Sequence, residues 1–524
     1  MHDLLRDPLI GIRTSAGAVR VNLPELLAAL VGGEVDAYTS LRAHQADPWH
    51  VFLVQLAASI LARNPAVTVP PSDPNFWRAG LLELADGVSS AWELQVEDVR
   101  QPAFLQHPLA SADELSHFKP NEPKAHTPDE LDVLVTAKDH DVKIARVRAD
   151  DAESWLYAIL ALQTTSSFLG AGNYGTVRMN GGFASRCVVS LVGSTATSER
   201  FIDELAAVRS MRSTVLAGGF GFVDQGTVLT WLRPWNRERP QYTFSDLEPW
   251  FIEAVRPVRL VASERGLVAL AATSRARQIG PRTLDNGDVG DPWLPINVAD
   301  KKKGRSALTP TAAGWTPEFI ARMLFQRGIE LTSLQRPRAH MGGNAWFIGS
   351  VLIRGKGTTE GFHRFSVPVP AKARLGLQRS DERERLGRLA ETLIVDAKES
   401  ERSLKAALMA LAEGGPAEVD FDKKAIAGWA ESVIKDFARS WADHFFPTIW
   451  RATEEDISTI QAAWRVTIVT HTREALRDAE SRVPVPSSRR YRALVRAHDL
   501  LNGSLRKKGL LPEHQHSPER ESAA

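Results

Sequence analysis

Three glycines in the stretch FLGAGNYGTVRMNGG, which begins at Phe168, have the spacing found in many nucleotide-binding loops. Gly170, Gly172 and Gly175 form the pattern G-x-G-x-x-G. In a dinucleotide-binding fold this pattern follows a strand and opens a helix, so that backbone N–H groups meet the pyrophosphate. The pattern alone permits a phosphate cradle, a loop that approaches another polyanion, or a structural turn.

The segments on either side of these glycines argue against the phosphate cradle. The preceding segment DDAESWLYAILALQTTSS predicts a helix, because an acidic first turn leads into apolar residues at helical spacing. The following segment SRCVVSLVG is typical of a buried strand. This order is the reverse of the nucleotide-binding one. Two interpretations of the glycines remain open. They form a structural turn, or they form a loop whose missing side chains let its backbone approach nucleic acid.

Residues that could support catalysis are sparse. Two His-Asp pairs, His140-Asp141 and His498-Asp499, lack further metal ligands at a recognisable spacing. The motifs G-x-S-x-G, H-E-x-x-H and the Walker lysine loop are absent. The single cysteine, Cys187, lies in the apolar segment RCVVSLV and is expected to be an inert buried thiol. We expect no catalytic residue, metal or cofactor; the alternative is a nucleotide- or metal-dependent enzyme that uses the glycines or the His-Asp pairs.

Basic residues gather in two places, although the formal net charge of the chain is only +1. The segment ADKKKGRS contains Lys301, Lys302 and Lys303. The last helical segment contains Arg489, Arg490, Arg492, Arg496, Arg506, Lys507 and Lys508. Each cluster alone is usually a solvated face. Together they indicate local phosphate-binding surfaces, because such clusters release counterions from nucleic acid.

The composition is that of an ordinary folded protein with more than one domain. The chain has 524 residues, of which 43% are hydrophobic and 24% charged. The N-terminal stretch MHDLLRDPLIGIRTSAG is charged and does not resemble a signal peptide. The longest apolar segment, residues 49–62, is shorter than the ~20 residues of a membrane span. We expect a soluble, cytoplasmic protein.

The distribution of elements predicts an α+β protein with a large mixed N-terminal domain followed by a C-terminal four-helix bundle. Residues 1–370 contain helical and strand segments, including two strands within 215–235 and a long hairpin with its tip at 355–361. Asp47 and Pro48 are expected to begin a strong helix. Residues 376–510 contain four amphipathic segments with short connections, which predict the bundle. Residues 511–524 are expected to be a disordered tail.

The order of these features resembles the CasA family, the large subunit of the type I-E CRISPR surveillance complex, Cascade. The opening HDLLRDPLIGIRTSAGAVRVNLPELLAAL is similar to that family's initial strand pair and helix. Later segments that resemble it are QPAFLQHPL, LDVLVTAKDHDVKIARV, FSDLEPWFIEAVRPVRLV and GDVGDPWLPI. The resemblance spans nearly the whole chain, and the order of degenerate motifs carries it.

The resemblance implies a non-catalytic subunit of an RNA-guided complex in antiviral defence. Such a subunit recognises the protospacer-adjacent motif (PAM) of double-stranded DNA while base pairing recognises the target sequence. It helps to start strand separation and R-loop formation, and it supports recruitment of a helicase-nuclease. The implied partners are the CRISPR RNA-containing Cascade subunits, PAM-containing DNA and that helicase-nuclease, with the segment around Lys138–His140 expected to dock on the RNA-bound subunits. A purely structural scaffold that never touches DNA is a further alternative.

The resemblance also implies three DNA-contacting elements. A loop rich in glycine enters the minor groove, and its counterpart here is GAGNY with Gly170, Gly172, Asn173 and Tyr174; nearby Arg178 joins the expected contacts. A lysine finger is replaced by Arg282 in GPRTLDNG, which is not an equivalent donor. A glutamine wedge is replaced by Asn344, Ala345 and Trp346 in HMGGNAWFIG. Trp346 either unstacks a base step or belongs to the core. Lys301, Lys302, Lys303, Arg489, Arg492 and Arg496 are expected to guide phosphates.

Overall fold

The fold is taken from a computed structural model of the chain, which confirms the α+β class. The structure describes residues 2–132, 151–180, 184–264, 266–280, 286–299, 302, 304–354, 359–416, 419–420, 424–483 and 485–511. Residue contacts divide the chain into two compact units. The first unit comprises Met1–Trp315 and Gly328–Ala371, and the second comprises Thr316–Arg327 and Lys372–Ala524. A short segment of the expected N-terminal domain thus belongs to the second unit.

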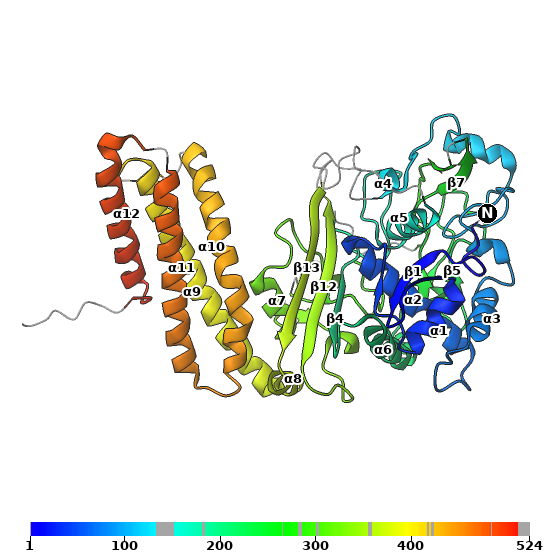
Figure 1. Ribbon diagram of the computed structural model, residues 1–524, viewed down its shortest axis with the longest axis horizontal. Helices are drawn as coiled ribbons and strands as arrows, with labels where there is room; N and C mark the ends of the chain where they lie inside the picture. The colour runs from blue at the N-terminus through cyan, green and yellow to red at the C-terminus, as the bar shows by residue number, and fades with distance from the viewer. Residues whose placement is uncertain are drawn as a thin grey trace, which may run out of the picture. The chain divides into compact units, whose positions relative to one another are not determined.

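The first unit contains helices and several small sheets (Figure 1). Its helices are α1 (Leu23–Val31), α2 (Ala43–Arg63), α3 (Pro74–Leu84), α4 (Pro128–Leu131), α5 (Ala152–Thr165) and α6 (Thr197–Ala217). Its strands are β1 (Ile10–Thr14), β2 (Gly17–Val21), β3 (Ala37–Tyr38), β4 (Val188–Val192), β5 (Thr227–Leu229), β6 (Leu247–Ile252), β7 (Val258–Ser263), β8 (Gly266–Ala271), β9 (Ile296–Asn297), β10 (Ser306–Ala307), β11 (Ile329–Glu330), β12 (Ala345–Arg354) and β13 (Thr359–Val369). Among the described residues the strand orders are β2-β1-β3, β10-β9-β11, β13-β12-β4, β5-β6 and β7-β8.

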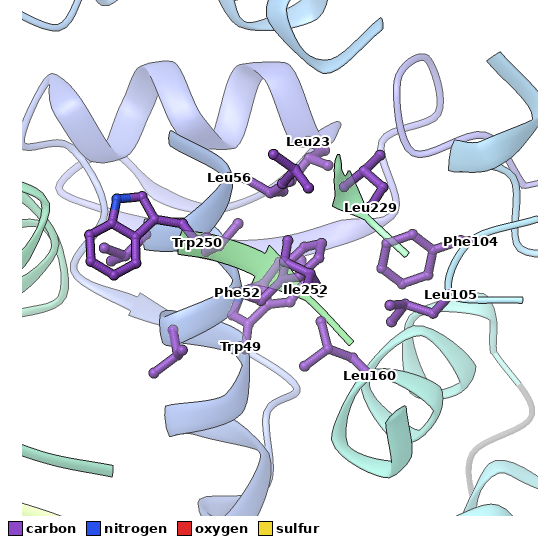
Figure 2. Close-up of a cluster of buried hydrophobic side chains, with 14 of the residues drawn as sticks. Leu23, Trp49, Phe52, Leu56, Phe104, Leu105, Leu160, Leu229, Trp250 and Ile252 are labelled. Atoms are coloured by element: carbon purple, nitrogen blue, oxygen red, sulfur yellow. The ribbon is translucent and has the colours of Figure 1, made fainter. Parts of the chain in front are cut away.

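Helix α2 lies in the middle of the hydrophobic core of the first unit. Figure 2 shows Trp49, Phe52 and Leu56 of this helix among Trp250 and Ile252 of β6. Trp49 stacks on Phe52 with ring centroids 5.6 Å apart. Every residue from Pro48 to Leu61 is buried, which is the placement of a core helix rather than a surface one.

Two expectations about local structure are wrong in this unit. Helix α2 starts at Ala43, five residues before Pro48, because Gln45 accepts a hydrogen bond from the backbone N–H of Arg42 and closes the first turn. Asp47 is therefore inside the helix and does not cap it. Residues 215–235 contain one strand, β5, instead of two, and the range begins with the end of helix α6. The sequence does not indicate α6, because it is polar with weak periodicity. Packing against α2 stabilises α6 instead.

The predicted long hairpin is confirmed as β12 and β13, which pair in antiparallel register from Ala345↔Val369 to Arg354↔Thr359. Strand β12 also pairs with β4 on its other side. The hairpin begins earlier than the sequence indicates, since β12 includes Ala345 and Trp346. This shift determines how the expected wedge residues are placed.

The second unit contains the predicted four-helix bundle. Its helices are α7 (Pro317–Leu324), α8 (Ala371–Gln378), α9 (Ser380–Ala412), α10 (Lys424–Arg451), α11 (Ile457–Arg482) and α12 (Ser487–Lys507). Helix α9 packs against α10, α11 and α12, and α10 packs against α11 (Figure 1). Trp464 of α11 donates its indole N–H to the Leu393 carbonyl of α9 at 3.0 Å. Within the described ranges, no helix is both long and apolar enough to cross a membrane.

The segment QPAFLQHPL is a buried connection in the first unit. The Gln106 side chain donates to the Leu94 carbonyl at 2.9 Å and accepts from the Leu260 backbone N–H at 2.6 Å. The His107 ring contacts the Ala254 carbonyl at 2.8 Å through Nε2. Burial lowers the pKa of His107 to about 4, although hydrogen bonds to backbone carbonyls act in the opposite direction. The ring is therefore neutral in the folded protein at neutral pH.

We predict that His107 makes the first unit less stable in acid. Because its folded-state pKa lies below the usual value near 6.5, the unfolded chain binds the extra proton first. The free energy of unfolding should fall by about 3 kcal/mol as the pH drops from about 6.5 to about 4. Urea unfolding across this range should show a shallower fall for His107→Gln than for His126→Gln, a change at an exposed histidine. Equal slopes for the two variants would contradict the assignment.

Candidate nucleic-acid interface

The segment Phe168–Gly175, which we call the glycine loop, leaves the end of α5 and turns back on itself. The Leu169 N–H donates to the Asn173 carbonyl at 2.9 Å, and the Asn173 N–H donates to the Gly170 carbonyl at 3.0 Å. Gly170 and Gly172 have φ of 105° and 84°, which side-chain-bearing residues rarely adopt. The glycines thus make a tight turn, as one of the two open interpretations predicts.

The glycines differ in what surrounds them. A Cβ atom at Gly175 would lie 2.8 Å from the Phe168 nitrogen, and one at Gly172 would lie 2.9 Å from Cβ of Thr273. Packing therefore excludes side chains at both positions. A Cβ atom at Gly170 would meet nothing within 4 Å. The turn around Gly170 and the exposed Ala171 is the part of the loop whose backbone another molecule can approach.

Two hollows lie beside the glycine loop, and each has basic side chains in its wall. Phe168 and Tyr174 line a cavity of about 460 Å³ together with Arg275 and Arg277. The lining of a second cavity, of about 270 Å³, includes Leu169, Asn173, Lys124, Glu130 and Arg256. Asn173 and Tyr174 are both half-buried. The glycine loop therefore contributes to the walls of two hollows, and both linings include basic side chains.

Arg178 lies in a buried cluster and does not face solvent, so the expected DNA contact does not fit its placement. Its guanidinium lies 3.3 Å from Oε1 of Glu253 and 3.5 Å from Oδ2 of Asp291. It donates to the Phe251 carbonyl at 2.9 Å and lies 3.6 Å from the centre of the Phe251 ring. Burial lowers the pKa of Arg178 to about 10 despite these carboxylates. Arg178 holds the segment after the glycine loop against β6.

The same cluster includes a second arginine and a second connection to the loop. Arg186 makes a bidentate pair with Asp291, with N···O distances of 2.6 and 2.8 Å. The backbone N–H of Val177 donates to Oε2 of Glu253 at 2.9 Å. Burial raises the pKa of Glu253, although Arg178 and the Val177 N–H act in the opposite direction. Two carboxylates and two arginines thus fix the segment that follows the glycine loop.

The expected wedge residues lie at the start of β12. Ala345 is completely buried, so its expected role at the DNA does not fit this placement. Asn344 is exposed, and its Oδ1 accepts a hydrogen bond from the Ala371 N–H at 3.1 Å. Trp346 is half-buried and pairs with Val192 of β4 and Pro368 of β13. The two residues that remain open to a partner are Asn344 and Trp346.

The arginines of the last helix are brought together in the second unit. Arg489, Arg492 and Arg496 occupy positions i, i+3 and i+7 of α12, which share one helix face. Arg489 and Arg492 are exposed, and the Arg492 side chain donates to the Gly414 carbonyl at 3.2 Å.

His498, one of the His-Asp residues, contacts Oε1 of Glu480 at 2.6 Å. Its ring nitrogen is used in a side-chain pair on the bundle.

Several expected contacts fall on residues that the structure does not describe. Arg282, Lys301, Lys303 and the segment Lys138–His140 lie outside the described residues. Lys302 is described and exposed. These positions remain predictions from the sequence.

The cysteine and the possible metal ligands bear on whether the chain could be an enzyme. Cys187 is buried, and burial raises the pKa of its thiol to about 12. In the part of the chain that the structure describes, no group of three or more His, Cys, Asp and Glu side chains is arranged to hold a metal ion.

Comparison of whole structures identifies the fold. The chain has the fold of the Cse1 (CasA) proteins, which supports the resemblance seen in the sequence. It matches Cse1 from Acidimicrobium ferrooxidans with a TM-score of 0.63 at 14% identity, over 98% of this chain and 99% of that one. It matches Cse1 from Thermobifida fusca with a TM-score of 0.62 at 12% identity, over 97% and 98% of the two chains. A chain of a solved CRISPR RNA-guided surveillance complex matches with a TM-score of 0.61 at 13% identity, over 95% and 99%.

Comparison of sequences gives no such match. No protein-family profile matches the chain, and no curated protein is significantly similar in sequence. At these identities the structures establish the fold, while the individual residues have diverged.

We predict that the buried cluster is a major source of stability for the first unit. Asp291→Ala would leave Arg186 buried without its bidentate partner, so the free energy of unfolding should fall by about 3–5 kcal/mol. Asp381→Ala removes one partner of an exposed pair with Arg379 and should change the free energy of unfolding far less, because water solvates the remaining charge. Urea unfolding of the purified chain measures both. Similar small losses for the two variants would show that the cluster does not hold the unit together.

Proposed function

We propose that this chain is the large subunit of a type I-E-like Cascade complex and that it recognises the PAM of double-stranded target DNA. In this proposal the chain itself is not catalytic and acts in the cytoplasm. The observation that carries the proposal is an open glycine turn, held by a buried ion-pair cluster, in a chain that shares the Cse1 fold over nearly its whole length. One of the matching chains belongs to an RNA-guided surveillance complex.

The glycine loop is the element that we propose enters the minor groove. Backbone near Gly170 has no side chain in its way and can approach base edges and sugars closely. Asn173 adds a side-chain amide, which can hydrogen-bond to the acceptors of the minor groove. The Tyr174 hydroxyl donates to the Arg275 carbonyl at 3.3 Å, and its oxygen can accept a hydrogen bond from the guanine amino group. A loop of this kind is sensitive to groove width as well as to the position of the guanine amino group.

Strand separation is assigned to the start of β12. Trp346 lies on a strand that pairs with a neighbour on each side, so its backbone is well fixed. Its ring is large enough to unstack a base step. Asn344 lies next to it and is exposed. Arg282 is proposed as the charged finger beside the groove.

Phosphate guidance and assembly complete the proposal. Arg489, Arg492 and Arg496 lie on one face of α12, where Arg489 and Arg492 are exposed and Arg496 is half-buried. The positive charge of this face suits the backbone of duplex or displaced single strand. Lys301, Lys302 and Lys303 are proposed to act in the same way. The segment around Lys138–His140 is proposed to dock on the CRISPR RNA-containing subunits. The chain is also proposed to help start R-loop formation and to support recruitment of the helicase-nuclease.

We predict that charge in the glycine loop abolishes recognition of duplex targets. Gly170→Asp adds an anion at a position where a Cβ atom meets no other part of the chain within 4 Å, and Gly172→Asp also displaces Thr273. In the reconstituted complex each change should weaken binding of PAM-containing duplex by at least about tenfold, because the carboxylate faces the phosphates. Binding of a single strand complementary to the guide should be kept.

Gly219→Asp is the matched control. Gly219 also has a positive φ, of 79°, and open surroundings, but it follows α6. This variant carries the same new charge as Gly170→Asp at a similarly open glycine with positive φ, and it should bind duplex as the wild type does. If the Gly170 and Gly172 variants keep wild-type affinity for duplex, the minor-groove assignment is wrong.

A further inference from the structure

Arg275 is an exposed arginine on a fixed backbone beside the glycine loop. Its N–H donates to the Arg237 carbonyl at 2.7 Å, and its carbonyl accepts from the Tyr174 hydroxyl at 3.3 Å. The preceding Ser274 N–H donates to the Gly172 carbonyl at 3.2 Å. The side chain is nevertheless 81% exposed. The backbone of Arg275 is therefore tied to the loop while its guanidinium projects outward.

The guanidinium of Arg275 is paired with a carboxylate on a turn of unusual conformation. Its NH1 atom lies 3.1 Å from Oε2 of Glu238, whose side chain is 58% exposed. Arg237, just before it, has φ of 65° and a buried side chain that lies 5.1 Å from the Phe118 ring centre. The Glu238 N–H donates to Oδ1 of Asn236 at 3.1 Å. A non-glycine residue persists in this conformation only where its surroundings fix it, so the turn presents Glu238 to Arg275 in a defined way.

The pair is easily exchanged. An ion pair between exposed side chains contributes little to stability, because water solvates each partner well. A phosphate can take the place of the carboxylate, since guanidinium binds both anions with the same planar set of donors. Losing the contact to Glu238 therefore costs little when a phosphate replaces it.

The cavity beside Arg275 suits the sugar that is attached to such a phosphate. Phe168, Tyr174, Pro240 and Ile279 give its wall a largely apolar character, and Arg275 lies at the same cavity. A deoxyribose has an apolar face and can rest against such a wall while its phosphate meets the guanidinium. The cavity adjoins the glycine loop, so a strand that passes the loop passes this cavity as well.

We infer that Arg275 binds a backbone phosphate of DNA held at the glycine loop, and that Glu238 occupies the guanidinium until the phosphate displaces it. This inference rests on the proposed function. It adds one contact between the chain and a DNA phosphate, next to the glycine loop. It also adds a carboxylate, that of Glu238, which competes with the phosphate for the same guanidinium. Glu238 then lowers affinity for every DNA by a similar factor, because phosphates carry no sequence information.

Three variants of the reconstituted complex test the inference: Arg275→Gln, Glu238→Gln and the double change. Duplexes with and without a PAM are titrated at several salt concentrations. Arg275→Gln should weaken binding of both duplexes about threefold to tenfold and reduce the slope of log K against log [salt] by about 0.9. Glu238→Gln should strengthen binding of both, and this gain should shrink when Arg275 is also replaced. Arg275→Lys should keep most of the salt slope.

Arg439→Gln is the matched control, since Arg439 makes an exposed pair with Asp436 on α10, with side chains 78% and 54% exposed. It should leave both affinities unchanged. If wild-type complex binds PAM-containing duplex while the Arg275 and Glu238 variants behave like the control, the inference is wrong and the proposed function stands. If Arg275→Gln weakens binding while Glu238→Gln leaves it unchanged, the competing role of Glu238 is wrong. If wild-type complex binds no duplex, the proposed function fails and the inference fails with it.

Discussion

The buried contacts among Arg178, Arg186, Glu253 and Asp291 join three segments that are distant in the sequence. They connect the residues after the glycine loop to β6 and to the turn that begins at Asp291. Four ionised groups are expensive to remove from water unless each is paired and hydrogen-bonded. Here each carboxylate has more than one donor, and Arg178 also contacts backbone carbonyls and the Phe251 ring. The position of the glycine loop depends on this cluster.

A loop fixed at its base and open at its turn is suited to shape recognition. Gly172 and Gly175 are required because neighbouring atoms leave no room for a side chain, whereas Gly170 faces open space. The same G-x-G-x-x-G pattern would serve a nucleotide phosphate if a helix followed it. Here the chain continues into the buried cluster and then into β4. The context of the glycines, rather than their spacing, determines what the loop can do.

Local patterns in the sequence predict some parts of this molecule and fail for others. The four bundle helices and the β12–β13 hairpin are predictable because each has its own periodicity and turn residues. Helix α6 is not, because packing against α2 stabilises a sequence with weak periodicity. Arg178 looks like a phosphate ligand next to glycines, yet its partner Glu253 lies 75 residues away. The burial of Arg178 is explained by an ion pair between residues that only the fold brings together. A single sequence does not indicate which residues pair in this way.

Affinity purification of this chain from its native host tests the central claim most directly. If the chain is the large subunit of an RNA-guided complex, small CRISPR RNA of defined length should co-purify with it, together with further protein subunits. The RNA should remain after nuclease treatment that removes unprotected RNA, since the subunits cover it. A chain that purifies alone, with neither RNA nor other subunits, would contradict the account.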